Sequence, residues 1–452
     1  LVCKFFKKIS MSEITIDATP GRLPKTWERP VTFFSNIGSL FFGNDGAANA
    51  LAKMVGALSS YGGRLAPVLT LIYGDHRHLL VVDQEPSLEL LAYQHDILGL
   101  PELDLLIASP ENYQSDAILE RIAAHESHWI DGFVTTGNME AIAQSTGKRC
   151  ISTATGSYRG NNKYLLHFAL AEMGLPLFET RTAGSGSELP DCLTGLDGKG
   201  YTHAAVKAQI GASGIGLVRC NCKQAAVEVP EYLFFEGPCL VQGWMDDSVA
   251  GVRRVRSPSV QMFIDDDRVC LYDITEQILD DDSVHEGNFA QSFTAHRVND
   301  EHRELLRQAR LVGEWLWRQG YRGTGSVDFH VAERNQGDAE VRVCEVNARV
   351  TGATYPSMLA RRFEPDGAWM MRNLRFHEEL RPGDLIERLD TASLLYRPGS
   401  GSGCLPINFN LAPDGTVAKG QFLFLAPTLG GIENQMVTME LLPKVGLVYD
   451  RD

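Results

Sequence analysis

Acidic and amide side chains with the potential for chemistry are concentrated in residues 325–349, GSVDFHVAERNQGDAEVRVCEVNAR. Two strand-like runs flank a polar turn, and residues two apart on a strand share one face. Glu345, Asn347 and Arg349 therefore point the same way, and a hairpin brings Asp328 toward them. Three of these side chains offer oxygen ligands, which suits Mg²⁺ because this hard cation takes few protein carboxylates. The residues alone also allow a solvated acidic turn or a calcium site.

A second stretch of this kind is THAAVKAQIGASGIGLVRC, residues 202–220. A strand-like run leads into Lys207 and continues into a turn that is rich in glycine. The turn contains Gly211, Ser213, Gly214 and Gly216. Glycines let backbone N–H groups approach an anion closely, and a lysine adds a point charge for a phosphate. Strand, lysine and glycine-rich hairpin together predict a flap that closes over phosphate groups.

Lys163 belongs to NNKYLLHFALAEMGLPLFE, residues 161–179. Asn161 or Asn162 can cap a helix here, apolar residues recur along one face, and Gly174 ends the helix. Lys163 then stands in the first turn. By itself such a lysine is most often a solvated surface residue, so its role depends on what the fold places beside it.

A third polar stretch is EGPCLVQGWMDDSV, residues 236–249, in which a strand runs into Gln242, Trp244 and Met245. A hinge of this kind can present backbone groups to the edge of an adenine and an apolar wall to its ring. A surface hinge with one buried tryptophan explains the same residues equally well.

Alternating strands and helices must position these residues. Apolar runs in the N-terminal third alternate with helical patterns, which predicts an open α/β sheet with crossover helices. The runs cover 31–35, 68–74, 78–84, 103–109 and 132–138. Farther along, 257–279 alternates like a hairpin around an aspartate-rich turn. A helix over 301–320, with apolar residues at core spacing, delivers the chain to the acidic hairpin.

The tail beyond residue 385 contains LYRPGSGSGCLPINFNLAPDGTVAKGQFLFLAPTLGG. The tripeptide PDG separates two apolar runs and predicts a hairpin turn between them. This tail suits either a flexible lid over a site or a contact between the subunits of a homo-oligomer, and the sequence does not choose between them.

Length and charge limit the classes of protein. At 452 residues the chain is too long for one ordinary core, and we expect about two to four domains. A net charge of −15 argues against general nucleic-acid binding, since phosphate backbones require basic surface. No apolar run approaches the ~20 residues that span a bilayer, so we expect no membrane partner and a cytoplasmic location. The nine scattered cysteines predict reduced thiols.

The order of these pieces resembles the ATP-grasp superfamily: NK at a helix start, a GLP turn, a strand lysine with a glycine-rich flap, an adenine hinge, then VDF and E-x-N-x-R. The match covers roughly residues 150–365. The flanking regions look like those of the ATP-grasp peptide ligases of pheganomycin-type antibiotic biosynthesis. The implied fold is multidomain, α/β and α+β: an ATP-grasp fold with an N-terminal open α/β (pre-ATP-grasp) domain and a small strand-rich C-terminal region.

The resemblance implies a role for each candidate residue. It implies that ATP contacts Lys163, Lys207, Gly211, Ser213, Gly214, Gly216, Gln242, Trp244 and Met245, and that Mg²⁺ is held by Asp328, Glu345 and Asn347. Gln242 takes the place of a glutamate that in many relatives reads the adenine amino group. Arg349 matches the arginine that faces the reacting carboxylate or its phosphate. The backbone N–H groups of Thr351, Gly352 and Ala353 are expected to hold an oxyanion.

We divide the chain into five parts. They are a lead-in over 1–30, a pre-ATP-grasp α/β domain over 31–150, an ATP-grasp small lobe with the flap over 151–245, a large lobe with the metal site over 246–384, and a strand-rich C-terminal domain or lid over 385–452. Within the lead-in, Met11 is the expected natural start, and residues 1–10 are set aside.

The implied reaction joins a carboxylate to an amine at the expense of ATP, with ATP and Mg²⁺ as cofactors. The resemblance points to an amino acid or its guanidino derivative as the acid and to the amino terminus of a peptide, or an amino acid, as the amine. Two alternatives remain: a ligase of two small amino acids, and a silent ATP-binding regulatory protein. The complete acidic triad with Arg349 argues against the silent protein, because a silent copy is free to lose ligands.

Overall fold

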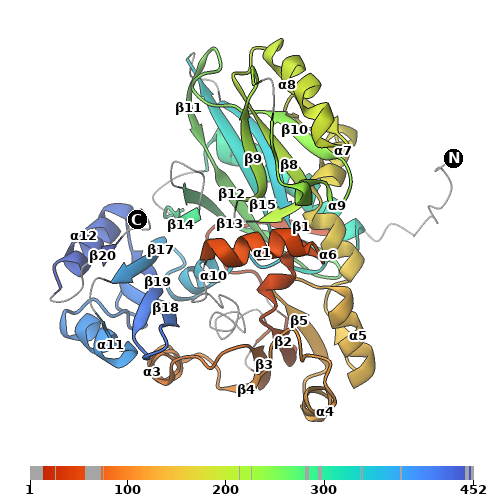
Figure 1. The fold of residues 1–452 in the computed structure, drawn as a ribbon. Helices are drawn as coiled ribbons and strands as arrows, with labels where there is room; N and C mark the ends of the chain where they lie inside the picture. The colour runs from red at the N-terminus through yellow and green to blue at the C-terminus, as the bar shows by residue number, and fades with distance from the viewer. Residues whose placement is uncertain are drawn as a thin grey trace.

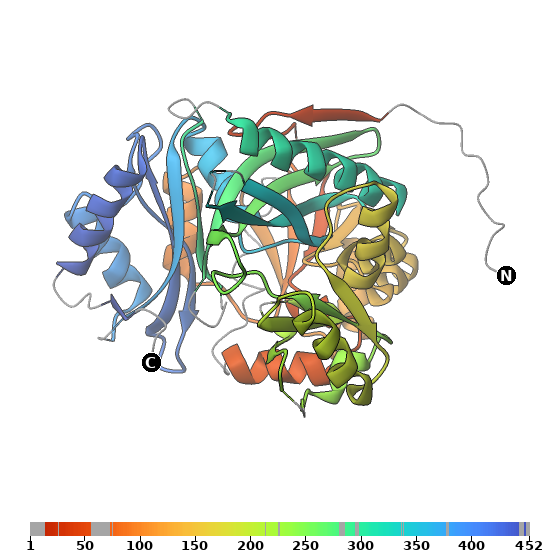
Figure 2. The same ribbon diagram turned by 90° about the horizontal axis from the view of Figure 1, so that it is seen from above.

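A computed structural model gives the fold of the chain. It describes residues 14–442 except 26, 56–72, 75, 213, 225–226, 280–284, 294–297, 336, 338 and 377–378, together with 447–448. Three sheets carry the architecture, and helices pack against them (Figures 1 and 2). The arrangement confirms a multidomain fold of the α/β and α+β classes. None of the described helices is long and apolar enough to cross a membrane.

The N-terminal sheet is parallel, with the strand order β4-β3-β2-β5-β6. Its elements are β2 (Val31–Phe34), η1 (Ile37–Phe41), α1 (Asp45–Val55), β3 (His78–Val82), α3 (Leu88–Ala92), η3 (Tyr93–Ile97), β4 (Leu103–Ile107), α4 (Asp116–Ala124), β5 (Trp129–Gly132), α5 (Gly137–Thr146) and β6 (Arg149–Cys150). Every residue of β2 and β3 is buried, as expected for central strands of a parallel sheet. The alternation of apolar runs and helical patterns therefore predicted this sheet correctly.

The strand predicted over 132–138 is placed too late in the sequence. Strand β5 ends at Gly132, and helix α5 already begins at Gly137. Helix α4 ends at Ala124, where the backbone of His125 becomes extended. Strand β5 therefore begins at Trp129, three residues before the predicted run. The run predicted at 68–74 lies largely outside the described residues.

The second sheet is antiparallel, with the strand order β7-β10-β8-β9. Its elements are α6 (Ala154–Asn161), α7 (Lys163–Glu172), β7 (Thr180–Ala183), η4 (Gly186–Glu188), α8 (Leu189–Asp197), β8 (His203–Ala212), β9 (Ile215–Asn221), η5 (Glu231–Phe234) and β10 (Cys239–Gly243). Asn162 caps α7 by accepting a hydrogen bond from the Leu165 N–H. Gly174 follows the helix with a φ of +69°, a left-handed conformation that ends helices.

The largest described sheet has 11 strands, with the main path β11-β15-β12-β13-β14-β17-β19-β18. Its elements are β1 (Thr15–Ala18), β11 (Val252–Arg256), β12 (Pro258–Ile264), β13 (Arg268–Leu279), β14 (His285–Ala290), α9 (Asp300–Arg318), β15 (Gly323–Arg334), β16 (Ala339–Asn347), α10 (Thr354–Phe363), β17 (Ala368–Phe376), α11 (Pro382–Thr391), β18 (Gly403–Leu411), β19 (Val417–Ala426), α12 (Leu429–Glu440) and β20 (Leu447–Val448). Helix α9 packs on this sheet with its predicted apolar stripe buried. The lead-in adds β1 to the edge of β13.

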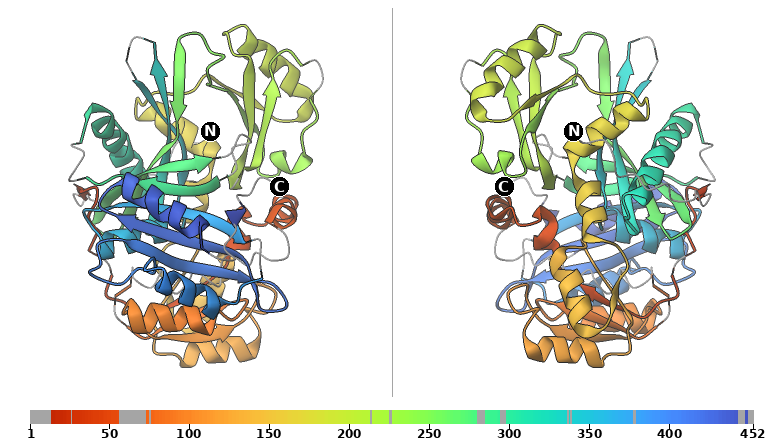
Figure 3. Two further views of the ribbon diagram at one scale, coloured as in Figure 1. Left: turned by 90° about the vertical axis from the view of Figure 1, so that its left-hand side faces the viewer. Right: turned by 90° about the vertical axis from the view of Figure 1, so that its right-hand side faces the viewer.

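Strands β18 and β19 form the hairpin that the PDG turn predicts. Gly415 has a φ of +83°, and the Thr416 N–H donates to Asp414 Oδ1 at 3.0 Å. Strand β19 pairs with β17, so the sheet runs without interruption past residue 385, where we placed the start of a C-terminal part. Figure 3 shows these strands packed beside the elements of the N-terminal sheet. The division at 385 stays a prediction.

A buried ion pair fastens α10 to this sheet. The side chains of Arg361 and Asp273 are both fully buried, and two guanidinium nitrogens donate to the two carboxylate oxygens at 2.9 Å each. Ser357 and Trp369 donate to the same carboxylate. The pair therefore connects β13, α10 and β17 through a carboxylate with several donors.

Candidate nucleotide and metal site

The hairpin of β15 and β16 brings the predicted metal ligands together. Asp328 pairs directly with Glu345, and Ser326 pairs with Asn347. Asn347 Nδ2 donates to Asp328 Oδ2 at 3.0 Å. From the neighbouring strand β12, Ser259 Oγ donates to Asp328 Oδ1 at 2.6 Å. Two carboxylates and one amide thus lie side by side, as the alternation of the two strands predicts.

Charge and burial act in opposite directions on the two carboxylates. Burial raises the pKa of Asp328, and the negative charge of Glu345 raises it further. Burial also acts to raise the pKa of Glu345, but Lys163 and Arg349 outweigh burial and hold that pKa below its usual value. A divalent cation beside both groups would remove their repulsion. Two carboxylates and an amide oxygen suit Mg²⁺, which usually completes its shell with water and phosphate oxygens.

Lys163 connects the acidic hairpin to the flap. Its Nζ lies 3.1 Å from Glu345 Oε2 and donates to the carbonyl oxygen of Gly211 at 3.1 Å. The preceding residue, Asn162, donates from Nδ2 to Gln209 Oε1 at 2.8 Å. The start of α7 therefore holds strand β8 at two points beside the predicted metal ligands, which gives Lys163 a site that its sequence context alone did not show.

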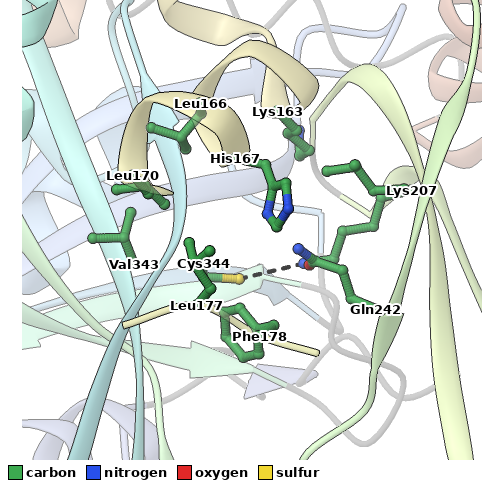
Figure 4. A pocket seen from close by; sticks show the side chains of 11 residues that line it. Lys163, Leu166, His167, Leu170, Leu177, Phe178, Lys207, Gln242, Val343 and Cys344 are labelled. Carbon is green, nitrogen blue, oxygen red and sulfur yellow. Dashed lines mark hydrogen bonds between the residues drawn. The ribbon is translucent and has the colours of Figure 1, made fainter. Parts of the chain in front are cut away.

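A pocket beside these residues contains three of the predicted nucleotide contacts (Figure 4). It is lined by Lys163, Leu166, His167, Leu170, Leu177, Phe178, Lys207, Leu240, Gln242, Val343 and Cys344, and its empty space, including the open mouth, is about 310 Å³. Figure 4 shows the leucines of α7 and Val343 on one side, with Lys207 and Gln242 on the other. An apolar wall that faces a few polar groups is the usual form of a small-molecule site.

Gln242 has a hydrogen-bond acceptor without a partner. The residue is 7% exposed, and its Nε2 donates to Thr180 Oγ1 at 3.3 Å. Within the described chain, Oε1 has no partner. Leaving a buried amide oxygen unpaired costs about 1–3 kcal/mol, so a ligand that brings an N–H donor to it is favoured. An adenine amino group is such a donor, which agrees with the role implied for Gln242.

A bulge in β16 turns Cys344 toward the pocket. The register of the hairpin shifts between Asp328 and Phe329, and Cys344 is the extra residue. Its Sγ lies 3.6 Å from Lys207 Nζ. Strict alternation places Cys344 on the face opposite to Glu345, so alternation along the strand did not indicate this contact.

The glycine-rich turn connects β8 to β9, as predicted. Gly214 and Gly216 have φ values of +80° and +88°, which side chains rarely adopt. A Cβ on Gly211 would lie 2.5 Å from the carbonyl oxygen of Ile215. Ser213 lies outside the described residues. The start of the turn packs in a small apolar cluster with η1 and α1, so the flap contacts the N-terminal part of the chain.

Trp244 and Met245 are not among the residues that line the pocket. The guanidinium of Arg219 lies 5.1 Å from the Trp244 ring centroid, and the indole is half-buried. The carbonyl oxygen of Met245 accepts a hydrogen bond from His330 Nε2 at 3.0 Å. Burial lowers the pKa of His330 to about 4, so the neutral ring is the donor. The hinge thus contributes Gln242 to the pocket, while these two side chains lie elsewhere.

Arg349 follows the acidic hairpin and lies within its electrostatic field. Burial lowers the pKa of Arg349, and the charges of Glu345 and Asp328 oppose this effect. Its guanidinium also donates to the carbonyl oxygen of Val350 at 3.2 Å. The Val350 N–H donates to the carbonyl oxygen of Phe133 at 2.9 Å, so this segment is joined to the chain at the carboxyl end of β5.

Two of the N–H groups expected to bind an oxyanion already donate hydrogen bonds to side chains at the start of α10. The Thr351 N–H donates to Thr354 Oγ1 at 2.9 Å, and the Ala353 N–H donates to Thr351 Oγ1 at 3.4 Å. An oxyanion therefore competes with side-chain oxygens for two of its three predicted donors. The third predicted donor is Gly352.

Four site residues were missed by the sequence analysis: Cys344, whose bulge is described above, and His167, Phe178 and Ser259. His167 follows Lys163 by four residues, and this spacing on a helix was an available signal. Ser259 belongs to a strand that touches the acidic hairpin only in the folded sheet. Phe178 reaches the pocket from the loop after α7, and no local pattern indicated that position.

Three solved structures share this arrangement over more than nine-tenths of the chain. Biotin carboxylase from Campylobacter jejuni, in complex with β,γ-ATP, has a TM-score of 0.56 and 13% identity over 93% of each chain. An ADP complex of purK, an N5-carboxyaminoimidazole ribonucleotide synthetase, has a TM-score of 0.53 and 14% identity over 95% of this chain and 98% of that one. This chain has the ATP-grasp fold.

The third structure with this ATP-grasp arrangement is the biotin carboxylase domain of 2-oxoglutarate carboxylase from Hydrogenobacter thermophilus, crystallised with MgADP, ADP and bicarbonate. It has a TM-score of 0.54 and 11% identity over 93% of this chain and 92% of that chain. Identities this low establish a common fold alone.

One curated relative adds a likeness in sequence. A [butirosin acyl-carrier protein]–L-glutamate ligase from Niallia circulans is 29% identical over 160 residues. The match spans 34% of this chain and 35% of that relative, so it covers about a third of either protein. No family model matches the chain.

Proposed function

We propose that this chain is an ATP-dependent ligase that joins a carboxylate to an amine through an acyl phosphate. The observation that carries this proposal is the position of Lys163. Its ammonium group touches both Glu345 and the carbonyl oxygen of Gly211, so one cation lies between the acidic hairpin and the flap. That is the position in which the phosphates of a nucleotide bound in the adjoining pocket would lie. Structures with the same fold that were solved as nucleotide complexes support the binding of a nucleotide.

The chain's own residues would bind and orient the phosphates. Lys163 and Lys207 enter the pocket from α7 and β8, and each can balance a phosphate charge. The N–H groups of the glycine-rich turn can approach phosphate oxygens closely. Asp328, Glu345 and Asn347 would hold Mg²⁺, which supplies further positive charge to the phosphate oxygens.

The proposed reaction has two transfer steps. A carboxylate oxygen attacks the γ-phosphorus, the bond to the ADP oxygen breaks, and Arg349 stabilises the charge on the acid or its phosphate. The nitrogen of the amine then attacks the acyl carbon, phosphate leaves, and the nitrogen gives up a proton to form the amide. Closure of the flap would exclude water, which otherwise hydrolyses the acyl phosphate.

We further propose that the acid is an amino acid or a modified amino acid, and that the amine is the amino terminus of a peptide. The name of the butirosin relative, which describes a glutamate ligase, supports an amino acid as one partner. The link to pheganomycin-type biosynthesis rests on the arrangement of the flanking regions in the sequence. A ligase of two small amino acids is the second candidate, since nothing in the nucleotide pocket distinguishes the two.

The test is release of ADP from MgATP in the presence of acid and amine panels, followed by mass spectrometry of the product. We expect Asp328→Asn to abolish substrate-dependent ADP release and to weaken binding of MgATP measured by calorimetry. Glu333→Gln is the matched control in the same hairpin, because Glu333 pairs with Arg253 at the surface. Tight binding of ATP without ADP release for any pair would favour a silent regulatory protein, and full turnover by Asp328→Asn would contradict the metal site.

A further inference from the structure

A second polar pocket lies on the sheet formed by β17, β19 and β18. It is lined by Asn373, Asn408, Asn410, Lys419, Gly420 and Gln421. The register explains why these side chains meet: Gln421 pairs with Asn373 on one neighbouring strand and with Asn408 on the other. Lys419 pairs with Asn410 in the same way. Four amides and one ammonium group therefore face the same side of three adjacent strands.

Two amide oxygens of this pocket have no hydrogen-bond partner among the described residues. Asn408 is 1% exposed and Gln421 is 4% exposed, so both amides are buried. Asn408 Nδ2 donates to Asn410 Oδ1 at 3.0 Å, and Gln421 Nε2 donates to Asn373 Oδ1 at 2.9 Å. Their carbonyl oxygens, Asn408 Oδ1 and Gln421 Oε1, have no hydrogen-bond partner in the part of the chain that the structure describes. The nucleotide pocket has the same feature, in Gln242 Oε1.

The pocket is connected to the predicted acyl site through the first turn of α10. Gln421 Nε2 also donates to the hydroxyl of Tyr355 at 3.0 Å. Tyr355 follows Thr354, whose hydroxyl accepts the Thr351 N–H. Thr351 lies in the turn that leads into α10, and Tyr355 is the second residue of that helix. A substrate that reaches from Arg349 past this turn would therefore meet the amide-lined pocket.

We propose that this pocket binds an amide group of a substrate of the ligation reaction. The two unpaired oxygens call for N–H donors, and the amide groups of Asn373 and Asn410 in the lining can donate to a carbonyl oxygen. A peptide bond or a primary amide offers both functions without a charge. A guanidinium offers N–H donors as well, but it is a cation, and the residues that line the pocket include no carboxylate to balance its charge. The proposal rests on the proposed ligase function and gives the chemistry of one substrate.

The test uses the full chain with MgADP and two probes, trialanine and L-arginine, with binding measured by calorimetry. We expect trialanine to bind the unchanged chain more tightly than L-arginine. Asn408→Leu and Gln421→Leu should each weaken trialanine by about tenfold or more, because each removes a buried acceptor. Asn408→Asp, which keeps an acceptor oxygen at the position, should retain trialanine binding better than Asn408→Leu. Gln435→Leu is the matched control, since Gln435 lies on α12 and does not line the pocket.

Three results would overturn the proposal. They are failure of trialanine to bind the unchanged chain, equal trialanine affinity in the leucine variants and the control, and tighter binding of L-arginine than of trialanine. Thermal unfolding and MgATP affinity show whether each variant is folded. If Asn408→Leu and Gln421→Leu do not fold, Asn373→Leu at the more exposed edge of the pocket provides the same comparison.

Steady-state kinetics then identifies which substrate carries the amide. A raised KM for the peptide amine with an unchanged KM for the acid places the amide in the amine, and the reverse result places it in the acid. An effect on neither KM contradicts the proposal. If the unchanged chain binds trialanine but releases no ADP with any acid and amine, the ligase function fails while the binding site stands.

Discussion

Two carboxylate sites in the large sheet, one fully buried and one half-buried, differ in how their charges are satisfied. Asp273 accepts hydrogen bonds from Arg361, Ser357 and Trp369, and its ion pair is fully buried. Asp328 also accepts hydrogen bonds, but it lies directly opposite a second carboxylate, Glu345. The first arrangement has cations and donors in proportion to its charge. The second has two adjacent negative charges. Lys163 pairs with Glu345, while burial and the charge of Glu345 raise the pKa of Asp328.

This difference separates a structural site from a functional one. A carboxylate surrounded by donors stabilises the fold and has no capacity left for a ligand. A carboxylate whose pKa is raised by burial and by a neighbouring carboxylate costs free energy when it is ionised in the folded protein, and a bound cation offsets that cost. We therefore expect substitutions at the first site to affect stability and substitutions at the second site to affect activity.

The largest expected effect is at the structural pair. Arg361→Ala should lower the free energy of unfolding by about 3–5 kcal/mol, because it leaves Asp273 buried without its counter-charge. Urea denaturation followed by circular dichroism measures this change. Arg361→Lys keeps the charge but not the paired hydrogen bonds. Its free energy of unfolding should lie between those of the unchanged chain and Arg361→Ala. A stable Arg361→Ala variant would show that the pair contributes little and would remove the contrast between the sites.

The next largest effect is expected at Glu345, on activity and not on stability. Glu345→Gln should reduce ligation by more than about 100-fold, the upper range for residues that support a metal site. Its free energy of unfolding should stay close to that of the unchanged chain, because relief of the repulsion with Asp328 offsets the loss of the ion pair with Lys163. Activity assays and urea denaturation on one protein sample give both numbers. A loss of stability together with activity would place Glu345 with the structural residues.

A third carboxylate, on β5 of the N-terminal sheet, shares features with both sites: it accepts a hydrogen bond, and its pKa is raised. Asp131, 8% exposed, accepts a hydrogen bond from Tyr73 at 2.5 Å, and burial raises its pKa to about 6. The folded state therefore holds the proton more tightly than the unfolded state, and stability falls as pH rises from about 4 through 6. Asp131→Asn cannot ionise. At pH 8 we expect the free energy of unfolding of the variant to exceed that of the unchanged chain by up to about 3 kcal/mol. At pH 4 we expect no such difference.

Denaturation curves of both proteins at pH 4, 6 and 8 measure this gap. A gap that does not change with pH would contradict the assignment of the raised pKa to Asp131. A gap that widens toward low pH would have the wrong sign.

The smallest effect is expected at the hinge. Trp244→Phe should change the KM for ATP by less than about twofold, because the indole lies against Arg219 and does not line the pocket. Gln242→Leu is the comparison, and it should raise that KM by about tenfold through loss of the buried acceptor. Equal effects of the two substitutions would mean that the indole reaches the nucleotide.

Local patterns predicted the parts of the site that depend on one stretch of chain. Alternation along two strands placed Asp328 opposite Glu345, and the glycines at 214 and 216 adopt the left-handed backbone that only a tight turn needs. The cap at Asn162 fixed the position of Lys163 at the start of α7. These features follow from residue spacing and backbone preferences, which act within a few residues.

The remaining features depend on contacts between distant strands. The bulge at Cys344 breaks the alternation on which the prediction rested. Ser259 reaches Asp328 from a strand 69 residues away in sequence. The amides of the second pocket come from β17, β18 and β19 and meet only through strand register. No local pattern encodes such pairings, so the sequence could not indicate them.

The central claim is that the chain activates a carboxylate as an acyl phosphate, and hydroxylamine tests it without knowledge of the amine. Hydroxylamine converts an acyl phosphate into a hydroxamate that mass spectrometry detects. With MgATP and a panel of amino acids, the unchanged chain should give at least one hydroxamate together with equimolar ADP, and Glu345→Gln should give none. Absence of hydroxamate for every acid in a chain that binds MgATP, or the same yield from Glu345→Gln, would contradict the account.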